Sequence, residues 1–201
     1  MPRATRTSSP AERSAATREK IVEAARELVC ERGYAGLRTA AVLERAGVSR
    51  GGLYHHFTGK TNLIAAVLEA VEVDLLKRLA DAVAGAPDPF TALQLGTQWF
   101  LDECLRSPEL QRAGLHEGRK ALGWETWRQT IEPLGIATLE ANFRAAQKAG
   151  QIHPADPRAL AHLMLAMLHE AATVIFTAPD PAAERDRVGT AVATVVDGLA
   201  S

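Results

Sequence analysis

The residues best suited to chemistry stand in the run TAAVLERAGVSRGGLYHHFTGK, which occupies residues 39–60. Arginine can bind guanine through two hydrogen bonds, and tyrosine, histidine and lysine can donate hydrogen bonds to phosphate oxygens. Glycine has no side chain, so a DNA backbone or base edge can approach it closely. This composition indicates contact with DNA. The candidate contact residues are Thr39, Arg50, Gly51, Gly52, Tyr54, His55, His56 and Lys60.

Two short helices are expected to position these residues, over residues 39–46 and 50–57. We expect Gly47 to end the first helix, because glycine adopts a positive φ without strain. Thr39 and Ser49 can each cap a helix with a hydroxyl oxygen. Two short helices joined by a tight turn predict a helix-turn-helix, whose second helix enters the major groove of DNA.

The same run resembles a known protein family. The signature of the tetracycline-repressor (TetR) family of bacterial transcription regulators is similar to Ala46-Gly47-Val48-Ser49, Gly51, Leu53-Tyr54, His56-Phe57 and Lys60. The resemblance covers about residues 17–64, and beyond them only the length and the helical pattern are similar. It implies that the eight candidate residues lie at or near DNA. Two positions depart from the family pattern. Leu43 stands where the family usually has a small residue, and Ala40 stands where a polar residue is common.

Charge divides the chain into two unlike parts. Residues 1–60 hold 11 basic and 6 acidic side chains, whereas residues 61–201 hold 12 basic and 18 acidic ones. A basic amino-terminal part fits a DNA-binding domain joined to a domain that does not bind DNA. Arg3 and Arg6 belong to an amino-terminal arm, which either follows the DNA as a functional element or is an ordinary frayed terminus.

One motif points instead to an enzyme. Residues 47–51 match G-x-S-x-G, the nucleophile elbow of hydrolases. That elbow requires a strand before the serine, and the preceding segment is expected to be helical. We therefore do not expect an enzyme.

Several other classes are also disfavoured. Cys30 and Cys104 are too few for a disulfide framework, so buried thiols are expected. No signal peptide is visible, and the apolar stretch over residues 159–178 is interrupted by two histidines and a glutamate, which argues against a membrane span and favours a cytoplasmic protein. His162 and His169 are seven residues apart, whereas metal ligands on one helix usually stand three or four apart. No metal or cofactor is expected.

The remaining pattern predicts an all-α fold. Ser-Pro and Asp-Pro pairs indicate helix starts, because the serine or aspartate can accept a hydrogen bond and proline has no N–H to leave unpaired. We expect about nine helices, at residues 10–32, 39–46, 50–57, 60–84, 89–106, 108–114, 119–149, 157–178 and 181–199. Pro133 should kink or interrupt the seventh helix, and Gly150 should end it. Residues 1–60 would form the arm and a three-helix DNA-binding domain, and residues 61–201 a helical effector-binding and dimerisation domain.

Two groups of apolar residues in the second part indicate binding partners. Aromatic and methionine side chains near a few polar groups are typical of a small-molecule pocket, and equally of a core. The candidate ligand-binding residues are Trp99, His116, Trp124, Trp127, Phe143, His162, Met164 and Met167. The last two helices carry more apolar residues than one buried face requires, which favours a homodimer through a four-helix interface.

These observations predict a TetR-like DNA-binding transcriptional regulator. The resemblance to the family implies a repressor that a small ligand, here expected to be apolar or aromatic, releases from a palindromic operator. We expect the helix at 60–84 to be the coupling element. Two alternatives remain open from the residues alone: a DNA-binding helical protein without an effector, and a helical enzyme or binding module.

Overall fold

The computed structural model describes residues 9–107, 109–110 and 115–201, with side chains described from residue 117 onward in the last range. Within these ranges the chain is all-α, as predicted. The helices are α1 (Pro10–Gly36), α2 (Thr39–Ala46), α3 (Arg50–His56), α4 (Lys60–Val83), α5 (Pro89–Arg106), α7 (Leu115–Leu122), α8 (Trp124–Thr130), α9 (Glu132–Lys148), α10 (Pro157–Thr177) and α11 (Pro181–Asp197).

The helix starts follow the capping pattern expected from the sequence. Ser9 forms a capping box with Glu12 at the start of α1. Ser107 accepts a hydrogen bond from the backbone of Leu110, although the helix expected at 108–114 lies largely outside the described residues. An aspartate cap followed by proline starts three further helices, at Asp88, Asp156 and Asp180. These helices therefore begin where side-chain oxygens satisfy free backbone N–H groups.

The start of α2 differs from the expectation. The capping position is Arg38, and no side chain caps this helix. Thr39 is already the first helical residue, whereas a side-chain cap must come from the extended residue before it. The expectation that Thr39 caps α2 is therefore wrong, and its exposed hydroxyl points to a different use.

The helix expected at 119–149 is three helices, α7, α8 and α9. Gly123 separates α7 from α8 with a φ of 86°, a left-handed conformation that favours glycine. Pro133 stands in the first turn of α9, where its missing N–H costs nothing, so the break falls just before it. Gly150, with a φ of 69°, follows the end of α9 as predicted.

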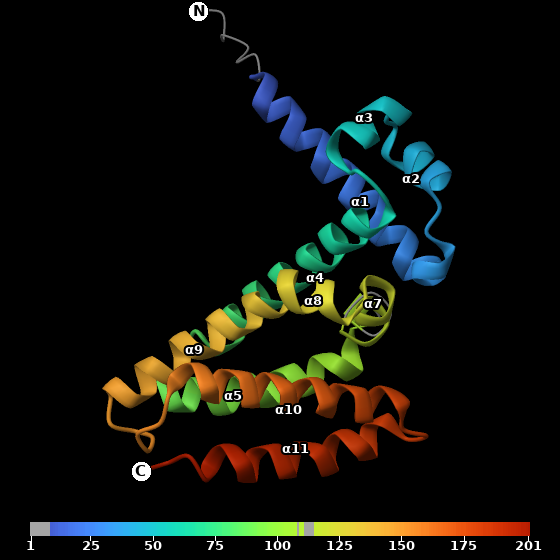
Figure 1. Cartoon of the computed structure of the whole chain (residues 1–201). Helices are drawn as coiled ribbons and strands as arrows, with labels where there is room; N and C mark the ends of the chain where they lie inside the picture. Colours follow the sequence, from blue (N-terminus) through green and yellow to red (C-terminus); the bar gives the residue numbers. More distant parts are fainter. Residues whose placement is uncertain (1–8, 108, 111–114) are drawn as a thin grey trace, which may run out of the picture.

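Two apolar cores meet along α4, the helix that runs from the group of α1, α2 and α3 to the bundle of α5, α9, α10 and α11 (Figure 1). The first core packs α1, α2 and α3 against the first half of α4, and it includes Trp127 and Ile131 from α8 and its end. The second core packs α5, α9, α10 and α11 around the second half of α4. Along α4, the side chains pass from the first core to the second between Val71 and Leu75. α4 thus belongs to both parts, and a domain boundary at residue 60 stays a prediction.

α10 is apolar enough to invite a different interpretation. Its length and its mean hydropathy of 1.6 would suit a membrane-crossing helix by composition alone. In the fold it packs against α5, α9 and α11 and buries seven residues in the second core. Packing inside a helical bundle explains this composition without a membrane.

Candidate DNA-binding surface and ligand cavity

The turn between α2 and α3 is fixed by its own backbone. Gly47 ends α2 in the left-handed conformation, with φ 64° and ψ 35°, as predicted. The N–H of Val48 donates to the carbonyl of Leu43 at 3.2 Å. Ser49 then caps α3 by accepting a hydrogen bond from the N–H of Gly52 at 3.1 Å. These local contacts set the angle at which α3 leaves the turn.

Packing and charge hold the two helices on α1. Val42, Leu53 and Phe57 are buried in the first core. On the surface, Arg45 of α2 donates two hydrogen bonds to the carboxylate of Glu31 on α1, at 2.6 and 3.0 Å. The inner faces of α2 and α3 are therefore fixed, which leaves their outer faces for a partner.

The outer face of α3 carries the predicted DNA contacts. Arg50, Gly51, Tyr54 and His55 are exposed, and Gly52 and His56 are half-buried. The guanidinium of Arg50 lies over the ring of Tyr54, 5.8 Å from its centroid. This cation–π contact keeps Arg50 on the exposed side of the helix. Tyr54 itself is 46% exposed, so its ring and hydroxyl are accessible to a binding partner.

Residues from three helices meet beside α3 in one small surface hollow. Thr39 of α2, Tyr54 of α3 and Lys60 of α4 line it together with Gly59, and its volume is about 40 Å³. Lys60 is the first residue of α4, where backbone N–H groups have no partner within the helix. A hydroxyl, a phenol, an ammonium and a helix start can all bind a phosphate. The structure thus brings together three predicted residues that belong to three different helices.

Packing within the protein does not require a glycine at position 51. A Cβ atom at this position would meet no other atom within 4 Å, and the residue lies in the first turn of α3. Glycine lowers helix stability relative to alanine. Its presence on the exposed face is consistent with a close approach from outside the protein.

The predicted ligand-binding residues do not gather around one space. Trp127, Phe143 and Met164 are buried within the cores, and Trp99 and Met167 are half-buried. Trp124 and His162 are exposed. The side chain of His116 lies outside the described residues. Trp124 and Trp127 do share a helix face, with their rings stacked at 5.7 Å. The seven described side chains line no part of the cavity between α4, α5, α9 and α10, because tertiary packing places them in cores or on the surface.

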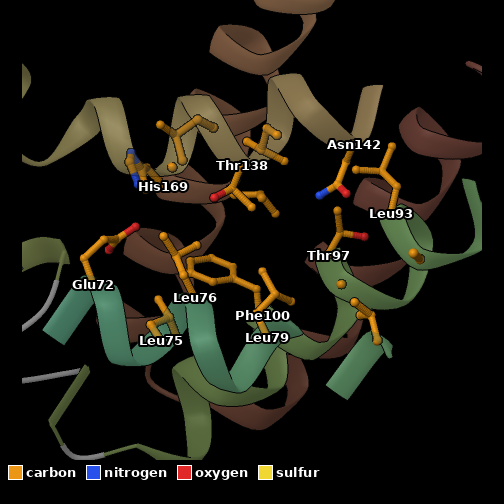
Figure 2. Close-up of a pocket in the computed structure, with 17 residues that line it drawn as sticks. Glu72, Leu75, Leu76, Leu79, Leu93, Thr97, Phe100, Thr138, Asn142 and His169 are labelled. Atoms are coloured by element: carbon orange, nitrogen blue, oxygen red, sulfur yellow. The ribbon is translucent and has the colours of Figure 1, made fainter. Parts of the chain in front are cut away.

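Four helices, α4, α5, α9 and α10, line that cavity, and Figure 2 shows the side chains that face it. The centres of water molecules can occupy about 70 Å³ of it, enough for several waters or a small organic molecule. Leucine side chains and Phe100 form most of its wall. Its polar groups are Glu72, Thr97, Thr138, Asn142 and His169. An apolar cavity with a few polar groups is the usual form of a small-molecule site.

Two titratable residues stand at one end of the cavity. Burial alone raises the pKa of Glu72, on α4, to about 7. Burial, helped by the positive charge of Arg119, lowers the pKa of His169 on α10 to about 4. The ring of His169 also packs edge-on against Trp127, with centroids 5.1 Å apart. His169 therefore connects the cavity to a side chain of the first core.

The cavity was not predicted, although the sequence contains one signal for it. Glu72 stands on the helix face that carries Leu68, Leu75 and Leu76, since these residues are three or four positions away. A glutamate within an apolar stripe is rare unless it has a function or a partner. The leucines around it come from four separate helices and gave no pattern in the sequence.

Comparison with known families decides the classification. Residues 90–199, more than half of the chain, match the tetracyclin repressor-like C-terminal domain, and residues 21–67 match the bacterial regulatory proteins of the tetR family. The chain belongs to the TetR family. TetR proteins are helix-turn-helix, DNA-binding transcription regulators and not enzymes, so the hydrolase-like motif at residues 47–51 is a coincidence of sequence.

Individual TetR relatives agree with this assignment. The HTH-type transcriptional regulator CymR of Pseudomonas putida is 43% identical over 97 residues, which are 46% of this chain and 48% of that protein. The regulator TtgR, also of Pseudomonas putida, is 42% identical over 55 residues, 27% of this chain and 26% of that protein. The chain thus spans about half or less of the length of these curated relatives.

Solved structures match over nearly the whole chain. A TetR-family transcriptional regulator from Pectobacterium atrosepticum superposes with a TM-score of 0.80 at 28% identity, covering 96% of this chain and 98% of that one. The SmeT–triclosan complex has a TM-score of 0.66 at 23% identity and covers 92% of this chain and 91% of its own, which shows a shared fold.

Proposed function

We propose that this TetR protein binds a palindromic DNA operator as a homodimer in the cytoplasm and represses transcription until a small molecule releases it. The observation that carries this proposal is the hollow in which Thr39, Tyr54 and Lys60 converge beside the exposed face of α3. A phosphate held there would orient α3 in the major groove. Arg50 would then read a base edge, and His55 and His56 would add backbone contacts.

A dimer is supported by unpartnered apolar residues on the last two helices. Leu163 of α10 is 70% exposed and Val195 of α11 is 54% exposed. Large apolar side chains in such positions suit a helix–helix interface with a second copy of the chain. Dimerisation would also place two α3 helices on half-sites about 34–36 Å apart, as a palindromic operator requires.

The cavity supports control by a small molecule. Its wall includes Glu72, Leu75 and Leu79 of α4, and the same helix begins at Lys60 beside the proposed DNA contacts. A ligand that fits only one position of α4 would therefore favour one spacing of the two α3 helices. The related fold of SmeT has been solved as a complex with triclosan, which supports a ligand site in such a bundle.

Fluorescence anisotropy tests the DNA-binding proposal. Labelled duplexes that tile the DNA flanking the protein's own gene are titrated with full-length protein over a salt series, against a scrambled duplex. We expect one native duplex to bind with a steep loss of affinity as salt rises, because phosphate contacts release counterions. Equal binding to native and scrambled duplexes would contradict operator recognition, and no binding at low salt would contradict DNA binding itself.

A further inference from the structure

The cavity contains an ionisable group that has no partner in the fold. Glu72 is only 8% exposed and lines the cavity, yet it makes no hydrogen bond or ion pair with any other described residue. Glu103, which is equally buried at 8%, shows the usual arrangement, since it pairs with Arg78. Buried carboxylates are normally paired because desolvation penalises the charge. Glu72 is therefore a buried carboxyl without a partner among the described residues, and a cation that entered the cavity would meet an unpaired acceptor.

The surrounding residues do not supply this cation. The cavity wall near Glu72 consists of Leu75, Leu76 and other apolar side chains, with His169 at the same end (Figure 2). His169 is neutral near pH 7, because burial and the charge of Arg119 lower its pKa to about 4. Arg119 does not line the cavity and lies over the rings of Trp124 and Trp127. Any positive charge at Glu72 must come from a bound molecule.

We infer that the effector is an apolar or aromatic molecule with a cationic head, such as a protonated amine, which binds against Glu72. This inference rests on the proposed function and specifies the chemistry of its ligand. The ammonium would donate to the Glu72 carboxylate, and the apolar body would lie between the leucines of α4 and Phe100 of α5. At the far end, Thr97 and Asn142 can hydrogen-bond a second polar group of a longer ligand (Figure 2).

The charge of Glu72 also predicts what the cavity rejects. A ligand carboxylate would place a second negative charge in the same apolar space, where repulsion between buried like charges is strong. A neutral hydroxyl can donate one hydrogen bond but leaves the carboxylate without a counter-charge. The expected order of affinity for ligands of one shape is therefore cation, then neutral molecule, then anion.

Three probes of similar size test this order: phenethylamine, phenethyl alcohol and phenylacetate. Their binding to the full-length protein, without DNA, is measured by isothermal titration calorimetry at about pH 8, where both Glu72 and the amine are charged. We expect the amine to bind at least about tenfold more tightly than the alcohol, and phenylacetate to bind most weakly. Glu72→Gln should reduce the affinity for the amine to that for the alcohol, whereas Glu72→Asp should keep the preference.

Glu69→Gln is the matched control, because Glu69 is an exposed glutamate one turn earlier on α4. It should leave the preference for the amine intact. Equal affinities for the three probes, no binding of any of them, or an unchanged preference in Glu72→Gln would each overturn the inference. These outcomes are separate from the anisotropy result: operator binding with no amine preference would overturn only the ligand chemistry, and amine binding without operator binding would overturn only the regulator.

Discussion

Arg26 of α1 donates hydrogen bonds from Nε and Nη2 to the two carboxylate oxygens of Glu109, the second at 2.7 Å. Its remaining terminal nitrogen, Nη1, bonds Asp74 of α4 at 2.5 Å and holds the pKa of that carboxyl below its usual range. One guanidinium thus joins the helix-turn-helix part to α4 and to the segment after α5. It stands at the junction that a ligand signal would have to cross.

Arg26→Ala should lower the free energy of unfolding by about 2 kcal/mol, because it leaves Glu109 and Asp74 partly buried without their partner. Urea unfolding at fixed protein concentration measures this. Lys77→Ala is the control, since Lys77 approaches the same Asp74 at 3.6 Å from an exposed position and should cost less than about 0.5 kcal/mol. Equal effects of the two substitutions would show that Arg26 is not a structural junction.

Gly51→Ala should separate stability from DNA binding. An alanine at this open helical position should raise the free energy of unfolding by up to about 1 kcal/mol, while its methyl group obstructs the DNA and lowers operator affinity at least about tenfold. Thermal unfolding and anisotropy measure the two effects. Gly47→Ala should instead lower the free energy of unfolding, because the left-handed φ of 64° strains alanine. Unchanged affinity in Gly51→Ala would remove this residue from the DNA contacts.

Arg50→Ala and Lys60→Ala should weaken DNA binding in different ways. Loss of a base contact from Arg50 should cost about 1–3 kcal/mol at one base pair and relax the preference there. Loss of a phosphate contact from Lys60 should weaken all sequences alike and reduce the salt slope by about 1. Anisotropy with single-base variants of the operator distinguishes them. A preference profile that Arg50→Ala leaves unchanged would contradict its role in base reading.

The raised pKa of Glu72 predicts a pH-dependent stability. The pKa of Glu72 in the folded protein, about 7, lies above its ordinary value of 4.5. Its contribution to the free energy of unfolding is therefore fully present below pH 4.5 and is lost as pH rises through about 7. His169 acts in the opposite direction. Its pKa is lowered from 6.5 to about 4, so its contribution to the free energy of unfolding is lost as pH falls. Between these values the two effects offset each other.

Glu72→Gln should therefore uncover the effect of Glu72. The unfolding free energy of the variant, relative to the natural protein, should rise by about 2.5 kcal/mol between pH 5 and pH 8. Chemical denaturation at each pH, at one protein concentration, measures the difference. Glu69→Gln, on the same helix but exposed, should show no such trend, and a constant difference for Glu72→Gln would mean that the buried carboxyl does not titrate as described.

Leu163→Glu should dissociate the proposed dimer. Two-fold symmetry would place the new charge at the interface twice, and the desolvation cost should raise the dimer dissociation constant at least about a hundredfold. Sedimentation velocity measures it. Leu95→Glu is the control, because Leu95 of α5 is also an exposed leucine but lies outside α10 and α11. A dimer that survives Leu163→Glu and fails with Leu95→Glu would place the interface elsewhere.

The helix-turn-helix could be predicted because its determinants act locally. The left-handed glycine at 47 and the cap at Ser49 each act within about four residues, and both are as expected. The expected helix at 119–149 failed at Gly123, where the apolar pattern continues but the backbone turns. A helical pattern tolerates one glycine in sequence, and only the packing of α7 and α8 determines whether the chain bends there.

The cavity could not be predicted because its wall is assembled from four helices. Trp127 and Phe143 have the residue types of a ligand pocket, but packing places both in the apolar cores. Leucine, which forms much of the wall of the cavity between α4, α5, α9 and α10, occurs throughout the chain. Glu72, a glutamate within an apolar stripe of α4, was a signal in the sequence for this cavity.

The sharing of α4 between two cores has a mechanical consequence. Glu72 lies twelve residues from Lys60, so the helix extends about 18 Å from the cavity to the DNA-facing end. A tilt of about 5° around the cavity would move Lys60 by about 1.5 Å, and the two-fold axis of a dimer would double this to about 3 Å, close to the rise of one base pair. Because packed helices tend to switch between discrete arrangements, we expect α4 to tilt in one step, so that the protein loses register with its operator abruptly.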